Sequence, residues 1–409
     1  MTGGGPLPMA MADGAAAPML TRLERAAGVA LGAHPMAPLP PPPTTTARAA
    51  LERVIARFLE RTPCVVSFSG GRDSSAVLAV AAHVARRDGL PLPIPFTFRF
   101  PGKPLTEESD WQEHVIAHLG LDDWQRVELH EELDLLGDVA RRCLTEIGLM
   151  WPANAYLHVP VFRAARGGTV LTGLDGDGLF GDWRWGHAQA VLHRRVAPRP
   201  RDVVRVGLAL APAALRRADY RRRGVFVPGW LSPTARGEYT STLLHRAAAE
   251  PRRWDRRVAW HAGARALYLA QRNLELIGAR DDVHVGNPLL HPDFLAALAH
   301  EGGPAGFGDR TEAMRHLAGD LLPVETVERR SKAAFGDAVW LDEARGFVES
   351  WNGRGLDPDL VDPEPLGQAW RAEYPVFHSW TMLHEAWLVS NGHGLSGETA
   401  ASGRAPDGA

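Results

Sequence analysis

The stretch that most constrains this chain is a loop rich in glycine and serine near position 70. A short apolar run from Val65 to Phe68 leads into SGGRDSS at 69–75, and an Ala/Val/Leu-rich helical pattern follows at once. We therefore predict a strand, a tight loop and a helix N-terminus, where backbone N–H groups and the helix dipole favour a bound anion. The Gly-Lys-Ser/Thr of a Walker A loop is missing. The alternative is a plain Gly/Ser turn in an ordinary α/β unit.

The residues SGGRDSS resemble the pyrophosphate-binding loop (PP-loop) of N-type ATP pyrophosphatases, which split ATP between its α- and β-phosphates. The resemblance implies that ATP is the cofactor. The residues that it assigns to ATP binding in this loop are Ser69, Gly70, Gly71, Asp73, Ser74 and Ser75. A carboxylate at Asp73 would repel phosphate unless a metal lay between them, which argues for Mg²⁺. A helix N-cap role for Asp73 is compatible with this assignment.

A second loop, LTGLDGDGLFGDW at 171–183, follows another apolar strand pattern. It is similar to the second signature of the asparagine synthetase family, in which a Gly/Asp loop precedes Leu-Phe-Gly and an aromatic residue. The resemblance assigns Gly173 to ATP binding and places Asp177 on the family's second magnesium-binding aspartate. Asp175 is an extra carboxylate, and Gly178 replaces the usual glutamate. Two carboxylate loops at neighbouring strand ends suit a metal that bridges phosphates.

The third motif is LPVETVERRSKAAFG at 322–336, which resembles the family's Leu-Pro…Arg-x-Lys-x-x-Phe segment. Lys332 falls on the family's catalytic lysine, which stabilises charge as an acyl-adenylate forms, and Arg330 matches the basic residue before it. Among 45 Lys plus Arg residues, only Lys103 and Lys332 are lysines. Because a planar guanidinium cannot replace a compact ammonium in a tight site, this rarity weakens the alternative that Lys332 is an incidental exposed lysine.

Strand and helix patterns alternate between residues 63 and 180, which is typical of a parallel sheet with crossover helices. The predicted fold class is α/β, a doubly wound parallel sheet of the PP-loop type (adenine nucleotide alpha hydrolase-like) with a mostly helical C-terminal region. Such sheets bind ligands at the carboxyl ends of their strands, where both loops would lie. The predicted organisation is a disordered Ala/Pro/Gly-rich arm (1–46), a nucleotide-binding core (47–183), a helical synthetase region (184–392) and a disordered tail (393–409).

The composition argues against several classes of protein. The net charge is −3 and no run of about 18 apolar residues occurs, so neither a polyanionic partner nor a membrane span is expected. The two cysteines, Cys64 and Cys143, suggest neither a disulfide framework nor a zinc site, and no secretory signal is recognisable. We therefore expect a cytoplasmic protein. An arginine-rich stretch at 194–223 is expected to form solvated helix faces rather than a nucleic-acid site.

The resemblance to the asparagine synthetase family covers residues 48–392. It implies a ligase that adenylates a substrate carboxylate, releases pyrophosphate and couples the acyl group to an amine. The family's N-terminal glutaminase has a cysteine right after Met1, whereas Thr2 stands there in this sequence. The glutamate that ammonia-using members carry after the second loop has no counterpart either. These departures favour a function like that of lasso-peptide macrolactam cyclases and β-lactam synthetases.

The predicted partners are a substrate that carries a carboxylate and an amine, such as a precursor peptide, and a partner peptidase or leader-binding protein. The acceptor pocket is predicted near Trp151, Asn154 and His291, and His291 replaces the acid of the family's Pro-Phe-Leu-Asp element. Three alternatives stay open: an ammonia-using asparagine synthetase, a tRNA-modifying PP-loop enzyme, and a degenerate scaffold that binds a partner peptide. The acid–base residue of the amide-forming step is left unassigned.

Overall fold

A five-stranded parallel sheet forms the centre of the fold, in the order β3-β2-β1-β4-β5. The computed structural model describes residues 19–41, 44–181, 183–200, 202–331, 333 and 335–395. The strands are β1 (Cys64–Ser67), β2 (Ile94–Arg99), β3 (Gln125–Glu128), β4 (Thr169–Leu171) and β5 (His284–Gly286). The predicted α/β class with a parallel sheet is confirmed, and β5 adds a short strand that the sequence patterns did not indicate.

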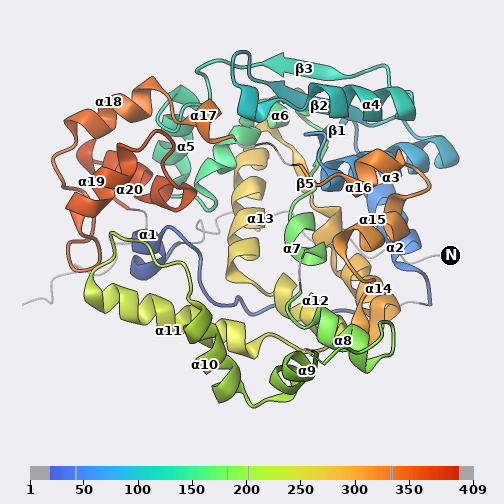
Figure 1. Ribbon diagram of the computed structural model, residues 1–409. Helices are drawn as coiled ribbons and strands as arrows, with labels where there is room; N and C mark the ends of the chain where they lie inside the picture. The colour runs from blue at the N-terminus through green and yellow to red at the C-terminus, as the bar shows by residue number, and fades with distance from the viewer. Residues whose placement is uncertain are drawn as a thin grey trace, which may run out of the picture.

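Helices connect and cover the strands, and they dominate the chain after β4 (Figure 1). Those of the first part are α1 (Arg22–Ala27), α2 (Ala47–Leu59), α3 (Arg72–Asp88), α4 (Ser109–Leu119), α5 (Asp138–Ile147), α6 (Val159–Ala164) and α7 (Gly176–Phe180). Those of the middle part are α8 (Gly186–Leu192), α9 (Asp202–Leu210), α10 (Ala213–Arg223), α11 (Pro233–Ala249), α12 (Trp254–Ala262), α13 (Arg265–Gly278) and α14 (Pro292–Gly302). The last are α15 (Arg310–Ala318), α16 (Val324–Glu328), α17 (Gly336–Val339), α18 (Asp342–Ser350), α19 (Pro363–Trp370) and α20 (Trp380–Ser390).

Both faces of the sheet are buried. Neighbouring residues of a strand point to opposite faces, and each face is covered by its own apolar cluster. On β1, Val65 joins one apolar cluster with residues of α13 and α20, while Val66 joins a second cluster with residues of α2, α3 and α14. On β4, Val170 and Leu171 divide between the same two clusters. The sheet thus lies between two helical layers, as a doubly wound fold requires.

Residues 20–31, which lie within the predicted disordered arm, are instead packed against the rest of the protein, whereas residues 35–38 are exposed. Helix α1 begins with a capping box in which the Thr21 hydroxyl accepts from the Glu24 N–H and the Glu24 carboxylate accepts from the Thr21 N–H. Glu24 also pairs with Arg265, at 2.7 Å, and Arg25 pairs with Glu385 of α20, at 3.1 Å. Composition therefore misled the prediction, although the spacing of Thr21 and Glu24 is a readable helix start.

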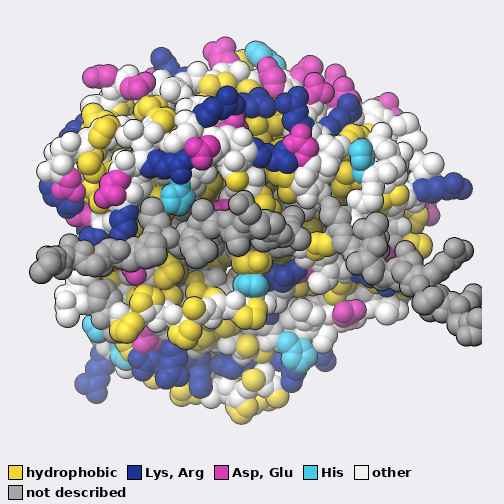
Figure 2. All heavy atoms as spheres, turned by 180° about the vertical axis from the view of Figure 1, so that it is seen from behind, with side chains coloured by type: hydrophobic (Ala, Val, Ile, Leu, Met, Phe, Trp, Pro, Cys, Tyr) yellow, Lys and Arg dark blue, Asp and Glu magenta, His cyan; other side chains and the backbone are white. Residues whose placement is uncertain are grey.

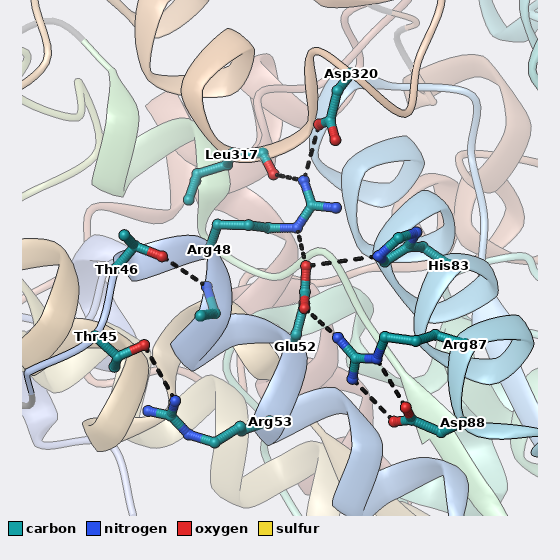
Figure 3. A network of polar contacts seen from close by, with 11 residues as sticks. Thr45, Thr46, Arg48, Glu52, Arg53, His83, Arg87, Asp88, Leu317 and Asp320 are labelled. Carbon is teal, nitrogen blue, oxygen red and sulfur yellow. Dashed lines mark hydrogen bonds and ion pairs between the residues drawn. The ribbon is translucent and has the colours of Figure 1, made fainter.

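A polar network joins α2 to its neighbours on the outer side of the sheet (Figure 3). Glu52 accepts from Arg48 at 2.7 Å and from Arg87 of α3 at 2.5 Å. Arg48 extends the network to α15 by donating to the Leu317 carbonyl oxygen and the Asp320 carboxylate. These contacts join α15 to α2 and, through Glu52 and Arg87, to α3, the helix that follows the first loop; α15 in turn contributes Arg310 to the site.

The arginine-rich stretch lies at the lower end of the molecule, where Figure 2 shows Lys and Arg side chains gathered on the back face. Several of these arginines have partners in the protein. Asp219 is largely buried and accepts from Arg222 and Arg223 of this stretch, and from Arg184, which precedes it. The Arg184 guanidinium also lies 3.8 Å from the ring centre of Tyr220. Internal pairing therefore accounts for part of this positive charge.

No helix among the described residues has both the length and the apolar character needed to cross a membrane.

Candidate active site

The first loop is ordered by its own serine hydroxyl groups. The Ser74 hydroxyl donates to the Gly71 carbonyl oxygen at 3.1 Å and accepts from the Ser69 N–H at 3.2 Å, and the two hydroxyl oxygens lie 3.1 Å apart. Gly70 has φ of 83°, which favours glycine. Helix α3 follows with Gly71 as its N-cap residue, and no side chain caps this end, which leaves the positive end of the helix dipole directed at the loop and suited to an anion. The predicted strand–loop–helix junction is confirmed.

The second loop is packed directly against the start of α3. A Cβ atom on Gly173 would lie 2.7 Å from the Ser74 nitrogen, and one on Gly176 would lie 2.7 Å from the Asp73 Cβ. Such separations are too short for any side chain, so both positions require glycine. The close approach brings Asp177 to the same site as Asp73.

A cavity of about 360 Å³ opens between these loops at the carboxyl ends of β1 and β4. Ligand pockets commonly have volumes of about 300–1,000 Å³. The described residues that line it are Ser67, Ser69, Gly71, Arg72, Asp73, Ser74, Glu108, His158, Thr172, Gly173, Leu174, Asp177, Leu274, Arg310, Arg330, Ser331, Ala333 and Phe335. All three sequence motifs thus contribute to one cavity. A larger hollow of about 1230 Å³ lies along β2 and β3 and shares Glu108 with it.

Arg310, which the sequence analysis missed, connects the two predicted magnesium ligands. Its guanidinium lies 2.7 Å from the Asp73 carboxylate and also pairs with the Asp177 carboxylate. Burial and the neighbouring charge of Arg310 lower the pKa of the Arg72 guanidinium. Two carboxylates that converge on one positive group are a donor set that fits Mg²⁺, which usually takes one or two carboxylates plus phosphate oxygens. Within the described residues, no group of three His, Cys, Asp or Glu side chains is placed to hold a metal.

Replacing Arg310 with methionine is expected to lower the free energy of unfolding by about 1–2 kcal/mol, because two partly buried ion pairs are lost and two carboxylates then repel each other. The loss should shrink when MgCl₂ is added, since a divalent cation can screen the same carboxylates. Urea denaturation with and without MgCl₂ measures both effects. Arg315→Met is the matched control, because Arg315 lies on the same helix and makes exposed pairs with Glu312 and Glu328. A loss that Mg²⁺ does not reduce would contradict the assignment of Asp73 and Asp177.

A buried ion pair ties the third motif to the first loop. The side chains of Arg329 and Glu108 are only 3% and 5% exposed, and they pair directly. Arg329 also donates to the Gly70 carbonyl oxygen at 2.8 Å and lies over the Trp111 ring. Glu108 in turn accepts from the Ala333 N–H at 3.2 Å. The segment around Ser331 and Ala333 is therefore held in register with the PP-loop.

The tip of the second loop is held by α12. Arg257 donates to the Leu179 and Gly178 carbonyl oxygens, each at 3.1 Å, and His261 lies 2.6 Å from the Asp175 carboxylate. A Cβ atom on Gly178 would lie 2.8 Å from the His261 ring. The extra carboxylate of Asp175 and the glycine that replaces the family's glutamate at position 178 are therefore related. The pair of His261 and Asp175 fills the space that a side chain at Gly178 would need.

The structure brings most predicted site residues together. Ser69, Gly71, Asp73, Ser74, Gly173, Asp177 and Arg330 all line the cavity. Ser75 is fully buried and does not line it, and Gly70 contributes through its carbonyl contact with Arg329. Lys332 lies outside the described residues, although its neighbours Ser331 and Ala333 both line the cavity.

The predicted acceptor-pocket residues are not part of the cavity. His291 is buried, and its Nδ1 atom accepts from the Asp293 N–H at the start of α14. The Trp151 carbonyl oxygen accepts from Asn273, and neither Trp151 nor Asn154 lines the cavity. A sequence pattern does not show which side chains of a segment face a site, because that depends on how the segment packs in the fold.

A parallel sheet covered by helices, with an uncapped helix start, two aspartates and several arginines at its strand ends, defines a doubly wound α/β protein with a candidate anion-binding site. The more specific relationship comes from comparison with known families. A model of the family "Asparagine synthase" matches residues 46–388, which is most of the 409-residue chain. The chain belongs to the asparagine synthase family. No individual curated protein matches it.

Proposed function

We propose that this protein adenylates a substrate carboxylate with Mg-ATP, releases pyrophosphate, and couples the acyl group to an organic amine. The family supports ATP-dependent formation of an amide bond in general. The observation that carries the proposal is the single cavity in which the PP-loop, Asp73, Asp177 and the Lys332 segment meet. The first N–H groups of α3 and the serine hydroxyls would hold phosphate oxygens. Asp73 and Asp177 would hold Mg²⁺, which offsets phosphate charge when bound.

The cavity also supports an organic substrate rather than ammonia. Beside its polar phosphate side, it is lined by the apolar side chains of Leu174, Leu274 and Phe335. Apolar walls favour the burial of hydrocarbon groups of a substrate. They provide no hydrogen-bond or charge partner for ammonia or ammonium. Positioning both reactants in one closed site could supply about 7–11 kcal/mol of the barrier reduction. We extend the proposal to modified-peptide or natural-product biosynthesis, with lasso-type macrolactam formation as the specific case.

A tRNA-modifying function gains little support from the arginine-rich end of the molecule. Arg184, Arg222 and Arg223 already pair with Asp219, and Arg195 donates to the Gly306 carbonyl oxygen. Salt-sensitive tRNA binding together with tRNA-stimulated release of pyrophosphate would favour that function instead.

ATP–pyrophosphate exchange tests the proposed function directly. Exchange should appear only when a suitable carboxylate is added, so free aspartate, free glutamate and peptides that carry either side chain are tested in parallel with MgCl₂. We expect exchange with at least one peptide and little product when ammonium is the only amine. The absence of exchange with every acid, together with no ATP binding, would contradict the adenylation proposal.

A further inference from the structure

One imidazole lies among the described residues that line the cavity, and it belongs to His158. This residue ends the short 3₁₀-helix Ala153–His158, directly before α6, and its side chain is half-buried. It lines the cavity together with Leu174 after β4 and Leu274 of α13. The 3₁₀-helix that carries His158 packs against α13, so His158 lies on the Leu274 side of the cavity, where the proposed organic substrate would lie.

The protein contacts fix the orientation of this ring. Its Nδ1 atom lies 3.3 Å from the Ala155 carbonyl oxygen, and the ring stacks on Phe162 with 6.0 Å between ring centres. A carbonyl oxygen only accepts, so Nδ1 carries the proton in this contact. The Nε2 atom then holds a lone pair, and no hydrogen bond to it is made by the described residues. Such a ring can accept a proton at Nε2.

The other ionisable side chains that line the described cavity are poorly suited to this role. They are Arg72, Arg310, Arg330, Glu108, Asp73 and Asp177. Arginines do not give up their protons, and the three carboxylates face guanidinium groups: Glu108 pairs with Arg329, and both aspartates pair with Arg310. Burial lowers the pKa of His158 below its usual value, which keeps the imidazole neutral at physiological pH.

We infer that His158 is the catalytic base of the amide-forming step, an inference that rests on the proposed function. The amine nitrogen forms a bond to the acyl carbon of the adenylate, and the bond between that carbon and the phosphate oxygen breaks. AMP leaves with the electron pair of that bond. The excess proton on the nitrogen moves to Nε2 of His158. Adenylation itself needs no such proton transfer, so the two half-reactions should separate in a His158 variant.

The test replaces His158 with asparagine, whose amide N–H can still donate to the Ala155 carbonyl oxygen. With an acid that supports exchange in the unmodified protein, we expect amide formation to fall by about 10²- to 10⁴-fold, while ATP–pyrophosphate exchange changes by less than about threefold. Hydroxylamine is largely unprotonated at neutral pH and nucleophilic enough to attack an acyl-adenylate without a protein base, and its excess proton is lost to water. The variant should therefore still form hydroxamate from the acyl-adenylate.

His300→Asn is the matched control, because His300 is exposed near the end of α14, away from the cavity. It should leave amide formation and exchange unchanged. Amide formation by His158→Asn at the unmodified rate would overturn the inference. Equal losses of exchange, hydroxamate and amide would also overturn it, since they would place His158 in nucleotide binding. Absence of exchange in the unmodified protein would instead overturn the proposed function, and the role of His158 with it.

Discussion

Replacing Glu108 with alanine is expected to lower the free energy of unfolding by about 3–5 kcal/mol, because it leaves the Arg329 guanidinium buried without its carboxylate. Turnover should be lost as well. Glu108 accepts from the Ala333 N–H, and Arg329 donates to the Gly70 carbonyl oxygen, so the pair aligns the third motif with the PP-loop. Urea denaturation and ATP–pyrophosphate exchange measure the two effects.

Glu113→Ala is the matched control for this variant. Glu113 lies on α4, five residues beyond Glu108, and its side chain is 60% exposed, so the change should stay within about 0.5 kcal/mol. The double variant Glu108→Ala/Arg329→Met should recover part of the lost stability, because no buried charge is left unpaired. A stable and active Glu108→Ala protein would show that the buried pair does not position the site.

Changing Lys332 to arginine is expected to reduce turnover by at least about 10²- to 10³-fold, as for the loss of one group that stabilises transition-state charge. The positive charge is kept, so ATP binding should persist. The planar guanidinium, however, cannot take the place of a compact ammonium between two cavity-lining neighbours. Steady-state kinetics and equilibrium binding of ATP separate the two quantities.

Lys103→Arg provides the same chemical change elsewhere, since Lys103 and Lys332 are the two lysines of the chain. Lys103 does not line the cavity between the two loops, and its substitution should leave turnover unchanged. Full activity of Lys332→Arg would refute the role given to Lys332, whereas loss of ATP binding would assign it to the nucleotide rather than to the reacting phosphorus.

Sequence reasoning predicted the parts of the fold that local patterns encode. The apolar run of β1 and the glycines of the first loop determine a strand, a tight turn and a helix start, and these occur as predicted. Strand β5 has only His284–Gly286, too short for a recognisable pattern. The arm around α1 has a composition typical of disorder, but burial by distant residues such as Trp230 and Arg265 overrides it.

The residues of the candidate site likewise fall into those that local sequence patterns predict and those that only the fold reveals. Residues of the three motifs could be predicted because their types and spacings suit phosphate and metal. Arg310 and His158 could not be predicted as site residues. An arginine at a helix start and a histidine before a helix are common, and only the neighbouring residues in the fold show that these two line a cavity. Glu108 and Arg329 are separated by 221 positions in the sequence. No local pattern could reveal that they meet.

The contacts of α1 have a consequence for how the chain reaches its native state. Glu24 contacts Arg265 across 241 residues, and Arg25 pairs with Glu385 near the other end of the described chain, in α20. Figure 1 shows α1 beside this C-terminal group of helices. During synthesis, α1 therefore cannot form these contacts until almost the whole polypeptide has been translated. Contacts between residues so far apart in sequence slow folding, and they tie the folding of α1 to that of α13 and α20.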